Sequence, residues 1–244
     1  MQKTCQYALI LLSSLFLFSC KNETDNVELD FGYNYFPTDS GHYVIYKGDS
    51  TTYDNFFNPV KIEHISFYLK ERIESHFTDI LGRPADRIER FVRNTPADPW
   101  TLLGVWYQVI SPTTAERVED NLRYVKLIFP QQVGSEWYGN KYITTQIPYI
   151  EPQFYFPWKY EITEKDVPYS NSFTSFDSTL TVQHVYDSTA INKTYSLEKY
   201  ARNVGMVYKE LWVVKGQTNI GQPWDQRAQK GFILTLKAIE SGNE

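Results

Sequence analysis

The chain has 244 residues, with 24 lysines and arginines against 29 aspartates and glutamates, so its formal net charge is −5. This mild acidity argues against nucleic-acid binding, which requires a basic surface, and against peripheral binding to anionic lipid. Aromatic residues make up 16% of the chain. They favour β-sheet because aromatic side chains pack well on pleated surfaces. The enrichment also fits a surface that contacts carbohydrate or lipid, although core packing is the commoner cause.

The first twenty residues have the pattern of an export signal. Lys3 is the only charged residue ahead of an apolar stretch at 8–18, and the small residue Ser19 follows it. The stretch is shorter than the roughly 20 apolar residues that a membrane-spanning helix needs. Ser19-Cys20 resembles the bacterial lipobox, in which the cysteine sulfur is acylated and becomes the new N-terminus. We therefore predict a lipoprotein signal peptide at 1–19 and a lipid anchor at Cys20.

Cysteine usage supports this prediction. The chain has two cysteines, and cleavage between Ser19 and Cys20 removes Cys5 with the signal peptide. Cys20 is then the only thiol, so it has no partner for an internal disulfide. A bacterial lipoprotein carries more than one acyl chain at this cysteine, which is what stable anchoring requires. The polar residues that follow predict a flexible tether at 20–30, ahead of a single β-rich domain at 31–244.

Strand patterns begin at 43–46, after the turn residues Asp39, Ser40 and Gly41. The strongest pattern lies at 62–77, where one parity carries Ile65, Phe67, Leu69, Ile73 and Phe77 and the other is polar. A period of two with one apolar side predicts a half-buried antiparallel strand. An unbroken strand of this length would span about 50 Å, so we expect a bend or a bulge within it.

Further strands are predicted along the rest of the chain, at 87–93, 102–110, 123–129, 154–162, 180–186, 204–215 and 232–239. Residues 113–120 form either a capped helix or a hairpin that turns at 119–121, and we favour the hairpin. A short helix is predicted at 224–230, with Gly231 as its C-cap. Many strands between turns predict a mainly antiparallel all-β fold, in which a curved sheet forms a sandwich or an open barrel with at most two short helices.

Residues with catalytic or metal-binding chemistry form no recognisable motif. The four histidines, His42, His64, His76 and His184, have neither metal-ligand nor triad spacing, and His184 lies among apolar residues as a core side chain would. His64 and His76 would lie about 40 Å apart on an extended strand, too far to share a metal. The sequence has no nucleophile elbow, zinc-protease motif or phosphate-binding loop. We therefore predict no catalytic residue, no metal and no cofactor.

The acidic residues Glu116, Glu119 and Asp120 suggest acid–base chemistry at first sight. They flank the predicted turn at 119–121, where charged side chains ordinarily face water. No second acidic cluster pairs with them in the sequence. We therefore expect them to be solvated.

Asp-Ser-Thr occurs three times, with its serine at Ser50, Ser178 and Ser188. The triplet resembles the short acceptor pattern for protein O-glycosylation in Bacteroidetes, which makes these three serines candidate glycosylation sites. Turn chemistry is the alternative, because Asp and Ser favour turns through bonds from their side chains to the backbone.

Three stretches, at 35–46, 176–182 and 199–210, resemble a family of lipoproteins of Bacteroidetes whose function is unknown. The resemblance covers most of the chain after Cys20, and its shared motifs are structural. It implies a Gram-negative cell envelope and a lipid anchor in the outer membrane. It implies no activity, ligand or catalytic residue.

The sequence thus predicts an outer-membrane-anchored lipoprotein with a non-enzymatic role in binding, scaffolding or assembly. Its expected partners are envelope proteins or glycans, and not nucleic acid. One alternative is a carrier of lipid or another apolar ligand in a half-open barrel, lined by strands such as 102–110 that are apolar on both parities. The other is an envelope glycan hydrolase, which needs two carboxylates facing each other about 5–10 Å apart.

Overall fold

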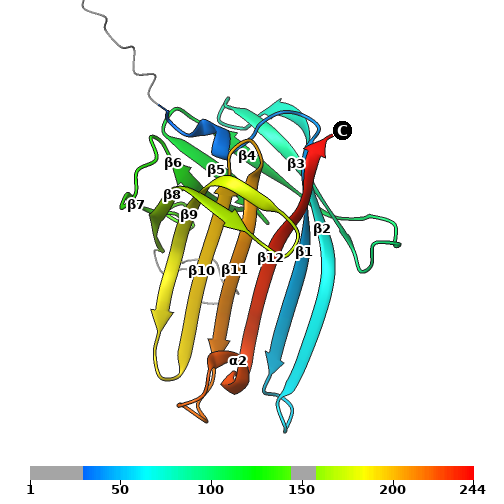
Figure 1. The fold of residues 1–244 in the computed structure, drawn as a ribbon, viewed down its shortest axis with the longest axis vertical. Coiled ribbons are helices and arrows are strands. Elements are labelled where there is room, and N and C mark those ends of the chain that lie inside the picture. The colour runs from blue at the N-terminus through cyan, green and yellow to red at the C-terminus, as the bar shows by residue number, and fades with distance from the viewer. Residues whose placement is uncertain (1–29, 144–157) are drawn as a thin grey trace, which may run out of the picture. The chain divides into compact units, whose positions relative to one another are not determined.

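Twelve β-strands pair side by side in one antiparallel sheet (Figure 1), in a computed structural model that describes residues 30–143 and 158–244. The strands are β1 His42–Asp54, β2 Lys61–Thr78, β3 Pro84–Arg93, β4 Thr101–Ile110, β5 Thr114–Glu119, β6 Leu122–Ile128, β7 Glu136–Tyr138, β8 Lys159–Ser170, β9 Ser175–Ser188, β10 Asn192–Ala201, β11 Gly205–Lys215 and β12 Lys230–Asn243. Two short helices accompany them, the 3-10 helix η2 at Tyr33–Tyr35 and the α-helix α2 at Trp224–Arg227. The predicted all-β, antiparallel fold is confirmed.

The order of strands across the sheet is β6-β5-β4-β3-β2-β1-β12-β11-β10-β9-β8-β7. Each neighbouring pair is therefore a hairpin between consecutive strands, except that β1 pairs with β12. The two edge strands meet, because the amide of Val125 donates to the carbonyl of Gly139 (2.7 Å) and the indole of Trp137 donates to the carbonyl of Val125 (2.8 Å). This contact brings the curved sheet close to closure as a barrel.

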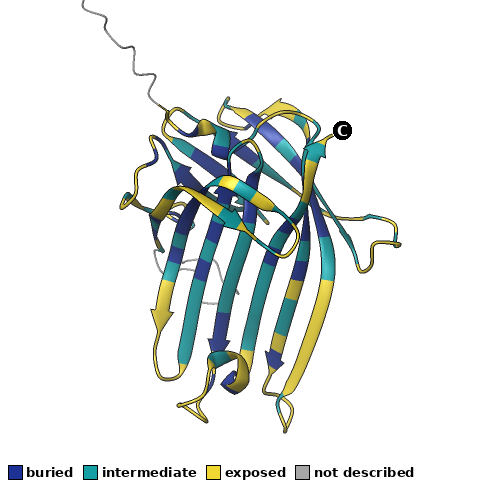
Figure 2. Ribbon diagram, in the orientation of Figure 1, coloured by how far each residue is buried: buried dark blue, intermediate teal, exposed yellow. Residues whose placement is uncertain are grey.

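The barrel closes at one end and stays open as a sheet at the other. β3 pairs with β2 only along 68–78, and β8 pairs with β9 only along 175–183. The rest of β2 and β9 therefore extends beyond these partners, as Figure 1 shows. Most buried residues gather at the closed end, and a smaller buried cluster of Tyr53, Val214 and Ala228 lies near α2, whereas 61–66 of β2 and 186–188 of β9 are exposed (Figure 2).

Helix η2 lies over the closed end and contributes to the core. Tyr35 is fully buried and Phe36 is 3% exposed, and the ring of Phe36 lies 6.2 Å from that of Tyr200. The main apolar cluster also includes Leu69, Leu127, Ile162, Leu180, Val182 and Val207. Residues Phe31–Glu244 form one compact unit. None of the helices described is long and apolar enough to cross a membrane.

Strand β2 contains the bulge expected from its length. Its register against β3 shifts between Ile73 and Ser75, so Ile73 faces Ile88 whereas Phe77 faces Ala85. Cross-strand partners share a face of the sheet, and Ile88 and Ala85 lie on opposite faces of β3. The bulge therefore moves Phe77 to the outer surface, where its side chain is 40% exposed. The prediction that Phe77 shares the apolar face of Ile73 is wrong for this reason.

The hairpin at 113–128 is confirmed, and the helix at its start is excluded. β5 and β6 are joined at Asp120 and Asn121, whose φ angles of 49° and 66° are those of a type I′ turn. The predicted helix at 224–230 is shorter, ending at Arg227. Gly231 is not its C-cap but lies in β12, where a Cβ atom would meet the carbonyl oxygen of Val213 at 1.9 Å.

Two further differences concern whole segments. Strand β10 was not predicted from the sequence, although it pairs along its length with β9 and β11. Part of the predicted strand at 154–162 lies outside the described residues, and β8 begins at Lys159. β10 is absent from the prediction because its inner face carries polar residues.

Candidate functional site

Charged side chains from neighbouring strands line the interior of the barrel. Glu71 of β2 binds two of them, because Nε of Arg90 lies 3.0 Å from one of its carboxylate oxygens and NH1 of Arg117 lies 2.9 Å from the other. Arg90 stacks over the ring of Trp106 at 3.4 Å from its centroid. The register explains the first pair, since Glu71 and Arg90 are direct cross-strand partners.

A second carboxylate, Glu198 of β10, is the centre of the remaining pairs. One of its oxygens lies 3.1 Å from Nζ of Lys126 and 3.0 Å from Nζ of Lys209, and the hydroxyl of Tyr200 donates to the other. Lys126 binds Glu119 as well, at 2.8 Å. Burial by itself raises the pKa of Glu198, but Lys126 and Lys209 outweigh burial and hold that pKa well below its usual range. We call Glu71, Arg90, Arg117, Glu119, Lys126, Glu198 and Lys209 the ion-pair core.

His184 belongs to the same interior. Its Nδ1 lies 3.0 Å from the hydroxyl of Ser196, its Nε2 lies 3.5 Å from Glu198, and its ring stacks on Tyr160 with centroids 4.0 Å apart. Burial lowers the pKa of His184 to about 3, so the ring is neutral at pH 7. The contacts follow the order of a Ser-His-acid triad. However, Ser196 and His184 are each only 2% exposed, and neither lines the interior cavities described next.

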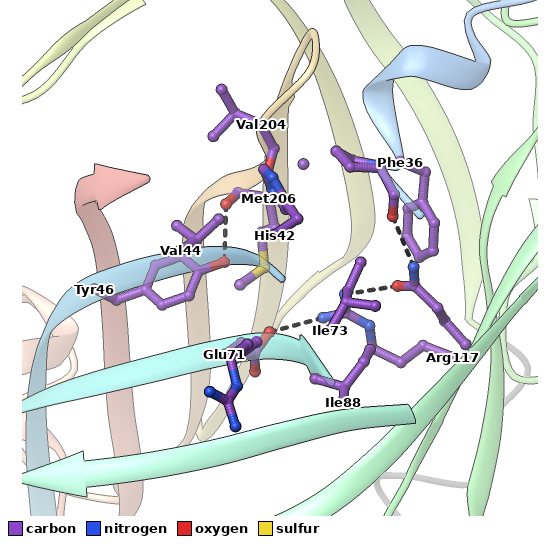
Figure 3. Close-up of a pocket in the computed structure, with 14 residues that line it drawn as sticks. Phe36, His42, Val44, Tyr46, Glu71, Ile73, Ile88, Arg117, Val204 and Met206 are labelled. Atoms are coloured by element: carbon purple, nitrogen blue, oxygen red, sulfur yellow. Dashed lines mark hydrogen bonds and ion pairs between the residues drawn. The ribbon is translucent and has the colours of Figure 1, made fainter. Parts of the chain in front are cut away.

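The ion-pair core encloses two adjoining cavities with volumes of about 40 Å³ and about 80 Å³. Glu71, Arg117 and Met206 line both cavities. Figure 3 shows the smaller one, which also touches Tyr46, whose hydroxyl donates to the carbonyl of Met206 at 2.9 Å. Spaces of this size hold a few water molecules. Ligand pockets typically measure about 300–1,000 Å³, so neither cavity has room for a lipid chain.

A larger hollow, of about 430 Å³, lies on the outer surface of the sheet. Its floor is built from alternate residues of three neighbouring strands, Tyr195, Leu197 and Lys199 of β10, Tyr208 and Glu210 of β11, and Lys237 of β12. Lys199, Tyr208 and Lys237 form one row across the strands, and Leu197 and Glu210 form part of the next. With Tyr169, Ser170, Asn171 and Ser172 they line what we call the outer-wall groove.

The end of the β8–β9 hairpin forms the wall of this groove. Three register shifts bend the hairpin, and Figure 1 shows its tip crossing in front of β10 to β12. The side-chain amide of Asn171 fixes the tip by donating to the carbonyl of Ala238 on β12 (2.9 Å). Tyr169 then lies against Tyr208, with ring centroids 5.7 Å apart. The groove therefore depends on residues that are distant in sequence.

Neutral donors hold the acidic group of the groove. Glu210 accepts from the hydroxyl of Tyr208 (2.9 Å) and from the indole of Trp212 (2.7 Å). Lys199 pairs with Glu164 at 2.9 Å, whereas Lys237 has no ion pair within the described residues. Burial raises the pKa of Tyr169 and of Tyr208, and Glu210 raises both further. Both phenols are therefore neutral at pH 7 and act as hydrogen-bonding groups with apolar rings.

The candidate glycosylation serines lie in three different environments. Ser50 is half-buried within β1. Ser178 lies within β9, and its hydroxyl donates to Asp166 (2.7 Å) and contacts Tyr35 (3.0 Å). Ser188 is exposed at the end of β9, next to a turn that the hydroxyl of Thr189 stabilises. Turn chemistry thus accounts for the third triplet, while the first two lie in strands.

The expectation that the three acidic residues near 120 face water is wrong for two of them. Glu116 is 4% exposed and pairs with Arg83 (3.0 Å) and Arg123 (2.6 Å), while the side chain of Glu119 is 14% exposed and pairs with Lys126. Asp120 is exposed and accepts from the indole of Trp106. Arg123 and Lys126 come from the second strand of the same hairpin and Arg83 from a distant part of the chain, so the turn itself does not leave the two glutamates in water.

The remaining predicted site residues do not come together. His42 binds the carbonyl of Val204, His64 the hydroxyl of Thr51, and His76 the carboxylate of Asp86, each at 2.9 Å. Within 30–143 and 158–244, no group of three or more His, Cys, Asp or Glu side chains is placed to hold a metal ion. Ser19 and Cys20 lie outside the described residues.

Sequence reasoning missed the floor of the groove together with β10. Inner residues Ser196 and Glu198 are polar, and outer residues Tyr195 and Leu197 are not, so the usual apolar-inside alternation is inverted along this strand. The period of two is present at 194–198, and it is the signal that would have identified the strand. Nothing in the sequence shows that the hairpin tip at 170–172 lies over it.

Two solved structures are similar to this chain. One is a candidate exported protein with a YmcC-like fold from Bacteroides fragilis, and the other is a candidate lipoprotein from Parabacteroides distasonis. Each shares 10% sequence identity with the chain, covers 85% of it and 98% of its own length, and superposes with a TM-score of 0.37. These values are too low to support a functional comparison. No family model matches the chain, and no curated protein matches it.

Proposed function

We propose that this chain is an outer-membrane lipoprotein, anchored through acyl groups on Cys20, whose barrel binds an envelope partner in the outer-wall groove and catalyses no reaction. The anchor rests on the sequence, in which Ser19-Cys20 ends a signal-like stretch and leaves one thiol in the chain. The binding role rests on the groove. The leaflet that the anchor occupies is not part of the proposal.

The contrast in size between the cavities carries the binding role. The interior cavities, at about 40 and 80 Å³, lie beside buried ion pairs in which each carboxylate already binds at least one cation. The outer-wall groove offers about 430 Å³ with tyrosine rings and hydrogen-bonding groups at its surface. Binding sites combine apolar or aromatic lining with a few placed polar groups, which is the composition of the groove. We therefore favour recognition on the outer wall over a ligand carried inside the barrel.

Site-specific photo-cross-linking tests the proposal. A photoreactive residue replaces Ser172, at the exposed rim of the groove, in the full-length protein expressed in its native envelope. The matched control replaces Val105, which is 45% exposed on β4. Irradiation is expected to yield a covalent adduct at position 172 and none at position 105. Equal adducts at both positions, or none at either, would contradict a binding role for the groove.

The anchor has its own test. Cys20→Ala is expected to abolish incorporation of a labelled fatty acid and to release the protein from the membrane fraction. Cys5→Ala is the matched control, because Cys5 lies in the predicted signal peptide, and it is expected to leave labelling unchanged. Labelling that persists in Cys20→Ala would exclude the anchor.

A further inference from the structure

Two tyrosines present their rings to the outer-wall groove from different parts of the chain. Tyr208 stands on the floor and Tyr169 on the wall, with interplanar angle 54° and centroids 5.7 Å apart. Tyr195 lies on the same floor, two rows farther along the strands. Aromatic faces favour flat ligands that present C–H groups, and a tyrosine adds a hydroxyl at its edge. The lining of the groove therefore contains three tyrosine side chains along its length.

Between these rings the groove offers both donors and acceptors. The carboxylate of Glu210 accepts hydrogen bonds, the ammonium of Lys237 donates them, and the hydroxyl of Ser170, which donates to Ser175 (2.8 Å), can accept them. Leu197 is the aliphatic residue of the lining. An acyl chain would desolvate the ammonium of Lys237, which has no ion pair within the described residues, and this is costly. The lining thus suits a ligand that has C–H faces and many hydroxyl groups.

The charges of the groove balance. Lys199 is paired with Glu164, and the formal charges of Lys237 and Glu210, which lie in adjacent rows of the sheet without forming an ion pair, cancel. A site for a polyanion would instead show unmatched cations, because complementary charge is what attracts such a ligand. The balanced lining favours an uncharged ligand.

From these observations we infer that the outer-wall groove binds a neutral saccharide, with sugar rings stacked on Tyr208 and Tyr169 and ring hydroxyls bonded to Glu210 and Lys237. The inference rests on the binding role proposed above and specifies its ligand class. It assigns no function to the ion-pair core.

The test uses the full-length acylated protein in a detergent without a sugar headgroup. Its binding is measured to immobilised oligomers of glucose, galactose, mannose and N-acetylglucosamine, with uronic-acid oligomers alongside. At least one neutral oligomer is expected to bind. Raising the salt to about 0.5 M, where the Debye length falls to a few ångströms, should leave binding unchanged. Uronic-acid oligomers are expected to bind no better than the neutral ones.

Substitutions distinguish the loss of a stacking contact from the loss of the fold. Tyr208→Ala is expected to weaken binding at least about tenfold, while Tyr208→Phe keeps most of it because the ring remains. Tyr107→Ala, on β4, is the control and should bind as the unmodified protein does. Circular dichroism of each variant verifies that the sheet is retained; if Tyr208→Ala unfolds, Lys237→Met takes its place with the same expected loss.

Two results would overturn the inference. One is the absence of neutral-oligomer binding, and the other is binding that is confined to acidic oligomers and lost at high salt. If the array is blank while cross-linking at position 172 captures an envelope protein, the saccharide inference fails and the binding role stands. If neither the array nor the cross-linking gives a signal, the saccharide inference and the binding role both fail.

Discussion

Glu198 and Glu210 lie on neighbouring strands and on opposite faces of the same sheet. Glu198 points into the barrel, is 1% exposed and binds two lysine ammonium groups, whereas Glu210 lies on the outer face and accepts from a phenol and an indole. Glutamate side chains therefore have two different environments in this barrel. Inside, charge is matched by charge and the space is nearly filled. Outside, neutral aromatic donors hold the carboxylate beside a hollow of about 430 Å³.

The comparison shows that a cluster of buried charge is not in itself an active site. Buried carboxylates with altered pKa values often indicate catalysis, but structural ion pairs alter pKa values as well. In the ion-pair core each carboxylate is matched to at least one cation, and the adjoining cavities are no larger than a few water molecules. Under the proposed function, the interior is a structural element and recognition belongs to the outer wall.

The largest expected effect comes from removing the interior charge. Glu198→Gln removes the buried carboxylate that Lys126 and Lys209 share, and Glu198 is the ion-pair partner of Lys209 in the described residues. Breaking a buried pair in this way costs about 3–5 kcal/mol of unfolding free energy. Glu210→Gln, the matched change on the outer wall, keeps an acceptor for Tyr208 or Trp212 and should cost less than about 1.5 kcal/mol. Urea denaturation measures both.

Equal losses in these two variants would contradict the division between a structural interior and a binding outer wall. The oligosaccharide-binding assay should rank the two variants in the opposite order. Glu210→Gln is expected to weaken oligosaccharide binding, and Glu198→Gln, under conditions where it is folded, is not.

A pH effect of intermediate size belongs to His184. The folded chain holds the pKa of His184 at about 3, below its ordinary value of 6.5, because the ring is buried. Below about pH 6.5 the unfolded chain therefore binds a proton that the folded chain does not. Stability is complete above pH 6.5 and falls as the pH is lowered, by at most about 1.4 kcal/mol per pH unit from this group.

Denaturation curves between about pH 7 and pH 5 isolate this contribution, because they avoid the range in which carboxylates titrate. His184→Gln is expected to flatten the decline in unfolding free energy. His64→Gln, at an exposed position on β2, is the control and should decline as the unmodified protein does. Parallel curves for His184→Gln and the unmodified protein would show that the ring is not held neutral inside the barrel.

The smallest effect concerns the wall of the groove. Asn171 donates to Ala238 and accepts from the amides of Phe173 and Thr174, so Asn171→Ala removes the bonds that fix the hairpin tip. A loss of about 1 kcal/mol is expected, with faster hydrogen exchange at 170–175. Ser172→Ala, in the same turn, should change neither the unfolding free energy nor the hydrogen exchange at 170–175. Unchanged exchange in Asn171→Ala would mean that the groove wall is held by other contacts.

The sequence predicted the fold where the interior is apolar. β2 was recognised because Leu69 and Ile73 face the core and alternate with polar residues. β10 was missed because its inner face carries Ser196 and Glu198 in place of apolar side chains. In β10 the alternation in polarity is present but inverted, so a search for apolar residues on the inner face does not find the strand.

The candidate site was beyond the reach of the sequence for a different reason. Tyr169 and Tyr208 meet because the bent β8–β9 hairpin crosses the outer face of β11, and the bend arises at Asp166, whose φ of 57° accompanies the register shifts. Periodicity predicts which residues share a strand face. It does not predict that a hairpin folds over that face.

Hydroxyl-radical labelling of the tyrosines tests the central claim most directly, because tyrosines report on both regions in one experiment. The full-length protein is labelled with and without the neutral oligosaccharide that the array selects. Tyr169, Tyr195 and Tyr208 are expected to lose labelling when the ligand is present, while the buried Tyr46, Tyr160 and Tyr200 remain unlabelled in both samples. Protection confined to other tyrosines, or ligand-dependent labelling of the buried three, would contradict the account.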